Sequence, residues 1–232
     1  MNLIQLQEGF EAIRLKGNRV ETVEKAVELA NACQQVRKYE AAITCLNKVL
    51  PDVQKDAGLL AVVKTALGTA YWEKAQLQKA LSHFEEGLTL FKEIDDKQGI
   101  AAILSIVGIT FWRKCEWEKA LEILKDALGQ NGEKKVEQRF ASLYGAFDRG
   151  IATLQNRVRL GRELQKPLKI LQPLFSMCPL YWVIGNHEQF KVCLDESVSL
   201  AEQLGKVDIL NAAKGLMRLA DSAWARSVHF CF

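Results

Sequence analysis

The chain carries one residue pattern twice, with a constant offset. Residues 67–72 read Leu-Gly-Thr-Ala-Tyr-Trp and residues 107–112 read Val-Gly-Ile-Thr-Phe-Trp, while residues 79–81 and 119–121 both read Lys-Ala-Leu. The offset from residue 67 to residue 107 is 40, and it keeps the glycine, aromatic and alanine positions in register. A fixed period of this length is typical of stacked helical repeats, because one unit cannot bury its apolar face without a neighbour. The pattern therefore favours a recognition surface over a catalytic core.

The spacing of apolar residues within each copy is helical. Between Val62 and Trp72, apolar residues recur three and four positions apart, which places them on one side of a 3.6-residue helix. With four prolines in 232 residues and few Asn-Gly or Asp-Gly turns, nothing supplies the hairpins that a β fold needs. We therefore expect two helices per unit, at 59–74 and 79–93 and then at 100–113 and 118–128.

The small residues of the pattern predict close helix contacts. Gly68 and Gly108 would let the first helix of a unit approach the second, and Ala80 and Ala120 would serve the reverse contact. A larger side chain at any of these positions would hold the helices apart, at a cost of about 1–3 kcal/mol.

These residues resemble the tetratricopeptide repeat, in which two antiparallel helices carry Leu-Gly-x-x-Tyr and Ala-x-x-x-Phe cores. The matching residues are Leu67, Gly68, Tyr71, Ala80 and Phe84, then Val107, Gly108, Phe111, Ala120, Leu124 and Ala127, and earlier Leu29, Ala30, Cys33, Ala42 and Leu46. The resemblance is strong over residues 22–128 and degenerate over 129–232. It implies an all-α fold, a right-handed α-α superhelix of about five units in one domain, 1–232, with a C-terminal capping helix.

The second half of the chain departs from the 40-residue period. Residues 164–171 align with 117–124 at an offset of 47, which predicts an insertion within 129–148. The alignment puts Pro167 at the position of Ala120, which requires Pro167 to lie in the first turn of its helix, where a missing N–H costs nothing. A further unit is predicted from 180 to 204. Asp208 is then expected to cap a last helix, 209–225, that covers the end of the array.

Composition argues against several classes of function. The 31 basic and 28 acidic residues are interspersed and give a net charge of only +3, so we expect no nucleic-acid binding. The uncharged run 170–186 contains Pro173 and Pro179, and is interpreted as two buried helix pieces rather than a membrane span. No secretory signal is visible, so the six cysteines are expected to be reduced core residues of a cytoplasmic protein.

Catalytic and metal-binding patterns are missing from the sequence. His187 and Cys193 are six residues apart, which does not bring them to one helix face, and phosphate loops, nucleophile elbows and His-Glu-x-x-His helices do not occur. We therefore expect a protein that is not an enzyme and has no cofactor or metal. A cysteine nucleophile with a histidine base from residues 150–232 stays open as an alternative, since such groups meet in space rather than in sequence.

In the family, the first helix of each unit lines the concave groove that grips a partner. Mapping by residue gives the expected partner-binding positions as Asn31, Gln34, Thr65, Thr69, Trp72, Glu73, Ser105, Ile109, Trp112 and Arg113. Trp72 and Trp112 occupy equivalent positions. They would form either an exposed apolar pair that dominates binding or packing residues beneath the next repeat, and the sequence does not decide between these alternatives.

The resemblance implies a non-enzymatic scaffold or adaptor that binds a partner protein or peptide in its groove. A regulatory module that senses a ligand or peptide and changes conformation is the alternative. Asn31 matches a position at which chaperone adaptors hold a C-terminal carboxylate, but that clamp needs basic neighbours where this chain has Val27, Ala102 and Ile106. The oligomeric state is open. A homodimer is one option, because the apolar end 227–232 could pack on the array or on a second copy.

Overall fold

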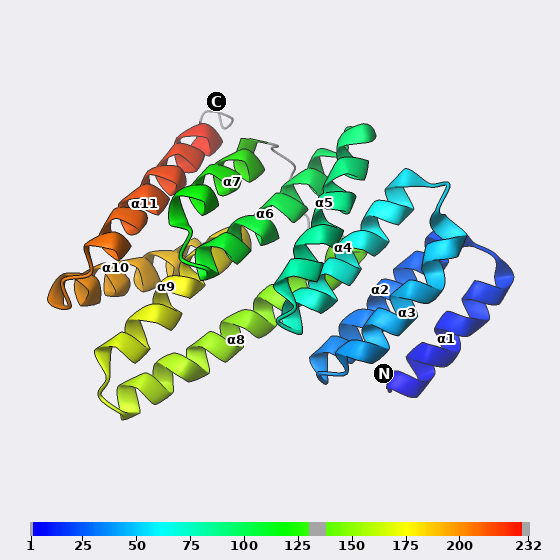
Figure 1. Cartoon of the computed structure of the whole chain (residues 1–232), viewed down its shortest axis with the longest axis horizontal. Coiled ribbons are helices and arrows are strands. Elements are labelled where there is room, and N and C mark those ends of the chain that lie inside the picture. The colour runs from blue at the N-terminus through cyan, green and yellow to red at the C-terminus, as the bar shows by residue number, and fades with distance from the viewer. Residues whose placement is uncertain (1, 130–137, 229–232) are drawn as a thin grey trace. The chain divides into compact units, whose positions relative to one another are not determined.

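The computed structural model describes residues 2–129 and 138–228, and within these ranges the chain is all helical (Figure 1). One short 3-10 helix, η1, accompanies eleven α-helices in the described part. The elements are α1 (Leu3–Lys16), α2 (Arg19–Gln35), α3 (Tyr39–Val53), α4 (Ala57–Glu73), α5 (Leu77–Glu93), α6 (Lys97–Arg113), α7 (Trp117–Gly129), η1 (Gln138–Phe140), α8 (Ala141–Glu163), α9 (Pro167–Val183), α10 (His187–Gln203) and α11 (Val207–Val228). The predicted all-α fold is confirmed.

One type of turn joins most of these helices. Its middle residue has a left-handed backbone with φ between 49° and 79°, and the equivalent residues are Arg37, Ala75, Asp95, Cys115, Gln165, Gly185 and Gly205. The next N–H in each turn donates to a carbonyl of the preceding helix five residues back, as from Gln76 to Tyr71 and from Asn186 to Tyr181. This arrangement satisfies carbonyls that a helix end would leave unpaired, so it ends each helix sharply. From 75 to 115 and from 165 to 205 the turn recurs every 20 residues.

Successive second helices bury the same set of positions. On α3 these are Ala42, Leu46, Val49 and Val53, on α5 Ala80, Phe84, Gly87 and Phe91, on α7 Ala120, Leu124 and Ala127, and on α10 Phe190, Leu194, Ser197 and Ala201. The spacing of three and four residues keeps one stripe of each helix inside. The predicted helices 59–74, 79–93, 100–113 and 118–128 agree with α4 to α7 to within three residues at each end.

The two glycines of the pattern lie where helices touch. A Cβ at Gly68 would come within 2.6 Å of the Phe84 ring, and one at Gly108 within 2.7 Å of Leu124 Cγ. Ala80 and Ala120 are fully buried on the facing helices. The predicted close contacts are therefore confirmed.

The register of the second half differs from the prediction. Residues 164–171 were aligned with the start of a second helix, 117–124, at an offset of 47, but α9 packs on α10, whose buried positions match those of the second helices α5 and α7. Pro167 does lie at the start of a helix, as predicted, but that helix is a first helix and not the equivalent of the second helix that carries Ala120. Residues 164–171 therefore do not begin a second helix. They lead into α9, which packs on α10 as the first helix of a pair.

Two further expectations about the second half need correction. Most of the run 170–186 forms one helix, α9, with Pro173 and Pro179 buried inside it, rather than two pieces. Each of these prolines removes one backbone N–H donor from the helix. Asp208 lies in the first turn of α11 rather than before it. The predicted last helix, 209–225, falls within α11, which packs on α7 and α10.

The chain forms two compact units by its internal contacts. Unit 1 consists of Met1–Val107 and Gln130–Ala146, and unit 2 of Gly108–Gly129 and Phe147–Phe232. The helices α6 and α8 each begin in unit 1 and end in unit 2. The single domain expected from the sequence stays a prediction.

Candidate partner-binding site

The ten predicted groove residues divide between the two units. Unit 1 holds seven of them, Asn31 and Gln34 on α2, Thr65, Thr69, Trp72 and Glu73 on α4, and Ser105 on α6. Unit 2 holds Ile109, Trp112 and Arg113. We call the surface of α2 and α4 that carries the first six residues the groove face. It is the part of the predicted site that the structure brings together.

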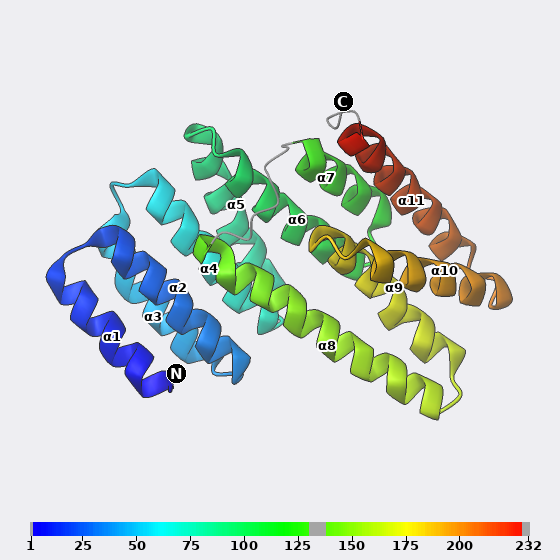
Figure 2. The same cartoon turned by 180° about the vertical axis from the view of Figure 1, so that it is seen from behind.

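A segment of the same chain lies against the groove face. The short helix η1 contacts both α2 and α4, and the start of α8 continues from it. Figure 2 shows this start of α8 beside α4. We call residues 138–142 the strap. It belongs to unit 1 together with the helices that it contacts.

A buried polar chain joins the strap to the groove face. The Ser142 hydroxyl donates to Gln34 Oε1 at 2.6 Å, and Gln34 Nε2 donates to Glu73 Oε2 at 2.6 Å. Gln34 and Ser142 are 0% and 1% exposed, so the bond between them is shielded from water, while the bond to the half-buried Glu73 is partly buried. Both ends of the Gln34 amide have a partner, as a buried amide requires. Of the predicted groove residues, Gln34 therefore binds the strap directly, and Glu73 is linked to it through Gln34.

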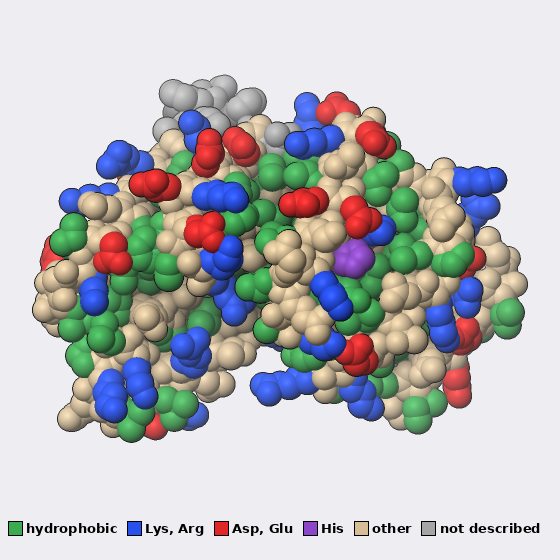
Figure 3. Space-filling model, viewed as in Figure 1, with side chains coloured by type: hydrophobic (Ala, Val, Ile, Leu, Met, Phe, Trp, Pro, Cys, Tyr) green, Lys and Arg blue, Asp and Glu red, His purple; other side chains and the backbone are tan. Residues whose placement is uncertain are grey.

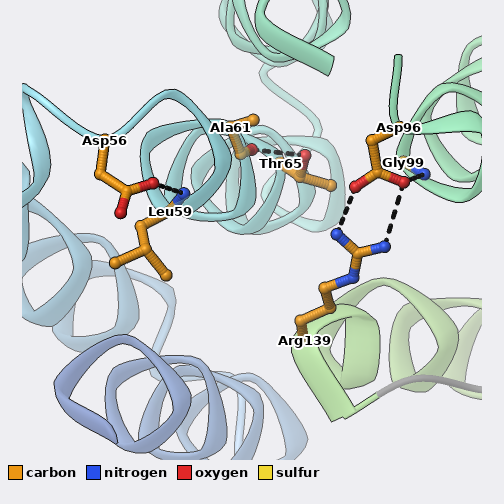
Figure 4. Close-up of polar contacts among 7 residues, drawn as sticks. All are labelled: Asp56, Leu59, Ala61, Thr65, Asp96, Gly99 and Arg139. Atoms are coloured by element: carbon orange, nitrogen blue, oxygen red, sulfur yellow. Dashed lines mark hydrogen bonds and ion pairs between the residues drawn. The ribbon is translucent and has the colours of Figure 1, made fainter. Parts of the chain in front are cut away.

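Arg139 provides the second attachment of the strap. Its guanidinium forms an ion pair with both carboxylate oxygens of Asp96, and Asp96 Oδ1 also accepts the Gly99 N–H at 3.0 Å (Figure 4). The guanidinium lies 5.8 Å from the centre of the Phe91 ring, within the range of a cation–π contact. Phe140, next to it, packs edge-on against Phe91 with ring centres 5.9 Å apart. The charged Arg139 and the aromatic Phe140, which are neighbours in the strap, thus contact Asp96 and Phe91 respectively.

The pKa of Asp96 reflects this attachment. Burial by itself would raise the pKa of this carboxyl, but the hydrogen bonds from Arg139 and from the N–H groups of Gly99 and Gln98, together with the Arg139 charge, lower it below its ordinary value. Asp96 is therefore ionised at neutral pH. Its carboxylate binds Arg139 of the strap and also accepts the Gly99 N–H in the first turn of α6.

The two threonines of the groove face point into the protein. Thr65 and Thr69 are almost fully buried, and each hydroxyl donates at 2.8 Å to the carbonyl four residues earlier, Ala61 and Thr65 respectively (Figure 4 shows the first). Asn31 and Glu73 are half-buried. On α6, the half-buried Ser105 donates in the same way to Ala101 at 2.8 Å. The threonines and Ser105 thus satisfy their hydroxyl groups within their own helices.

Both tryptophans are buried in the structure. Trp72 is 4% exposed and Trp112 is 2% exposed. Within unit 2, the Trp112 indole N–H donates to the Phe175 carbonyl at 2.9 Å, and its ring centre lies 4.7 Å from that of Phe175. Ile109 is fully buried and Arg113 is exposed. The exposed apolar pair is therefore not present.

Sequence reasoning missed four residues of this arrangement, Asp96, Arg139, Phe140 and Ser142. The strap falls in the region that was interpreted as an insertion, where no repeat pattern marks it. Asp96 does carry a signal. It lies 40 residues after Asp56, and each of the two directly precedes the first helix of a unit.

The cysteines do not form a reactive site in the described residues. Cys33, Cys45, Cys178 and Cys193 are buried, and burial raises the pKa of Cys45 to about 12 and that of Cys193 to about 11. Such thiols stay protonated and are poor nucleophiles. Across 2–129 and 138–228 no group of histidine, cysteine or acidic residues is arranged to hold a metal. His229, Cys231 and the apolar end 229–232 lie outside the described residues.

The fold and the groove face define a helical-repeat protein with a face that holds a peptide segment. The tetratricopeptide repeat family model matches residues 21–93 and 59–130, so this part of the chain consists of tetratricopeptide repeats. Curated proteins gave no match to the chain. The crystal structure of BtubC (BKLC) from P. vanneervenii is similar in fold, with a TM-score of 0.53 and 18% identity, over 88% of this chain and 91% of that one.

Two surface properties bear on the kind of partner. On the face shown in Figure 3, basic and acidic side chains are interspersed among apolar ones. In the part of the chain that the structure describes, no helix has the length and apolar character needed to cross a membrane.

Proposed function

We propose that this protein is a non-enzymatic scaffold or adaptor that binds a partner protein or peptide on the groove face of unit 1. Tetratricopeptide repeats generally mediate protein–protein interaction. The interspersed charge supports a protein partner rather than a nucleic acid. The free, buried cysteines support a reducing compartment, which we take to be the cytoplasm.

One observation carries the proposal. Gln34, fully buried on α2, accepts a hydrogen bond from Ser142 at the start of α8 and donates one to Glu73 on α4. The side chains of this face therefore recognise a peptide segment by hydrogen bonds. A regulatory module that changes conformation on binding is the second candidate, because a partner that reaches this face has to move the strap.

Site-specific crosslinking would test the proposal. A photoreactive amino acid would replace Asn31 or Ser105 in the full chain, both half-buried on first helices, and Glu85 on the exposed side of α5 would serve as the matched control. We expect a saturable crosslink to one protein from the first two positions and not from Glu85. A crosslink from Glu85 alone would move the site to another face. No saturable crosslink from any position would contradict the scaffold function.

A further inference from the structure

We propose that the strap is an intramolecular occupant of the partner site, and that the partner carries the same chemistry. That chemistry is a cationic residue followed directly by an aromatic one, with a hydroxyl three positions after the cation, as in Arg139, Phe140 and Ser142. The proposal rests on the proposed function and adds both the class of partner and its control. The protein is closed at this face until a partner segment displaces the strap.

The strap binds as a ligand binds, through side chains. Arg139 and Ser142 make its two polar attachments, to Asp96 and to Gln34, and Phe140 fills the space against Phe91. The residues on the receiving side come from α2, from the end of α5 and from the start of α6. A separate peptide that presents the same three groups can therefore form the same contacts.

The receiving side selects for positive charge. The Asp96 side chain is only 15% exposed and its carboxylate is ionised, so leaving it without a cation would be unfavourable. A second carboxylate, that of the half-buried Glu73, accepts a hydrogen bond from Gln34. An acidic segment would be repelled by both groups. A cation beside an aromatic ring also fits the Phe91 ring, which the guanidinium and Phe140 contact together.

Exchange of strap for partner conserves most contacts, so the strap competes mainly by being tethered. A tethered segment acts at an effective concentration in the millimolar range when its linker is short. A free segment of equal chemistry therefore binds the closed protein weakly. Weakening the strap should raise the affinity for that free segment without any change to the receiving residues.

The strap peptide itself provides the probe. A fluorescein-labelled peptide of residues 138–146 is titrated with the full chain and followed by fluorescence anisotropy. Ser142→Asp opens the strap, because a carboxylate would face Gln34 Oε1 and lie near Glu73. Ser142→Ala is the matched control, since it removes one hydrogen bond and adds no charge. We expect the peptide to bind the Ser142→Asp chain at least about tenfold more tightly than the unaltered chain, with Ser142→Ala in between.

Peptide variants check the chemistry. The same peptide with Arg139→Glu or Phe140→Ala should lose most of its affinity for the Ser142→Asp chain. Equal binding of the peptide to the unaltered and Ser142→Asp chains, or to neither while both keep their helical circular dichroism, would overturn the proposal. So would peptide variants that bind as well as the parent.

Hydrogen exchange on the unaltered chain keeps the proposal testable if Ser142→Asp fails to fold. Excess peptide should speed exchange of the strap amides while α2 and α4 stay protected, and unchanged strap exchange would contradict displacement. The crosslinking experiment separates this inference from the proposed function. A partner crosslinked equally to the unaltered and Ser142→Asp chains would refute the strap and keep the scaffold.

Discussion

At the scale of single residues, close helix pairing depends on a glycine at which a larger side chain would clash with the facing helix. Gly68 faces the Phe84 ring so closely that an added Cβ would lie at 2.6 Å, whereas nothing lies within 4 Å of a Cβ at Gly9. Both glycines lie inside helices, so alanine has the better helix propensity at both. Replacing each glycine by alanine therefore separates the effect of helix packing on stability from the effect of helix propensity.

We expect Gly68→Ala to lower the free energy of unfolding by about 1–3 kcal/mol, because the rigid ring has to move. Gly9→Ala should be neutral or raise it by up to about 1 kcal/mol. Urea denaturation followed by circular dichroism measures both values. A neutral Gly68→Ala would mean that α4 and α5 can separate without cost.

His83 couples stability to pH. Its ring stacks on Tyr71 with centres 5.3 Å apart and planes 7° apart, and its Nδ1 is buried without a hydrogen-bond partner among the described residues. Burial, and then the charge of Lys64, lower the pKa of His83 below its ordinary value of 6.5. The folded state thus disfavours the charged ring. The stability from the neutral ring is fully present above pH 6.5 and falls as pH drops below 6.5 toward the lowered pKa.

His83→Phe keeps an aromatic ring and removes the titration. We expect the loss of unfolding free energy between about pH 7.5 and pH 5.5 to be smaller in this variant than in the unaltered chain. Urea denaturation at both pH values measures the difference, and other titrating groups cancel between the two proteins. An identical pH dependence would show that His83 is not responsible.

At the scale of elements, the starts of helices α4 and α5 differ in capping. Asp56 Oδ1 accepts the Leu59 N–H at 3.0 Å and caps α4 (Figure 4). Gln76 precedes α5 without a side-chain cap, and its Oε1 is buried without a hydrogen-bond partner in the described part of the chain. We expect Asp56→Ala to lower the unfolding free energy by about 1 kcal/mol and Gln76→Ser to raise it by up to about 1 kcal/mol. Denaturation curves that show the opposite signs would rule out capping as the cause.

The elements predicted most accurately are those with a strict repeat. The helices from 57 to 129 were predicted because the 40-residue offset preserves both the apolar stripe and the turn that ends each helix. After residue 130 only the apolar stripe was available. First and second helices carry the same spacing of three and four residues between apolar positions, so the stripe alone does not reveal that residues 164–171 lead into a first helix.

The groove residues stay a prediction, and the strap that lies against six of them was not predicted, for a related reason. Gln34 and Ser142 are 108 positions apart, and Asp96 and Arg139 are 43 apart. No local pattern encodes such contacts. The burial of Trp112 likewise depends on the Phe175 carbonyl, 63 residues away. Helical spacing identifies the side of a helix on which a tryptophan lies, but only the tertiary contacts decide what covers that side.

At the scale of the whole molecule, four buried thiols can be used to follow the unfolding of each of the two units. Cys33 and Cys45 lie in unit 1, and Cys178 and Cys193 lie in unit 2. Burial raises the pKa of all four, to about 12 for Cys45 and about 11 for Cys193. Cys115 is exposed, so the expectation that it is a core residue was wrong. In the native protein at about pH 8, we expect iodoacetamide to alkylate Cys115 quickly and to spare the buried four.

Urea then tests whether the units unfold together. The helices α6 and α8 each run through both units, so unfolding either unit breaks hydrogen bonds of a helix that the other shares. We therefore expect Cys33 and Cys45 to become reactive over the same range of urea concentration as Cys178 and Cys193. Brief alkylation at each concentration, followed by peptide mass spectrometry, measures the four transitions separately. Distinct midpoints for the two pairs would show two independently folding units and would contradict the single domain that the sequence predicts.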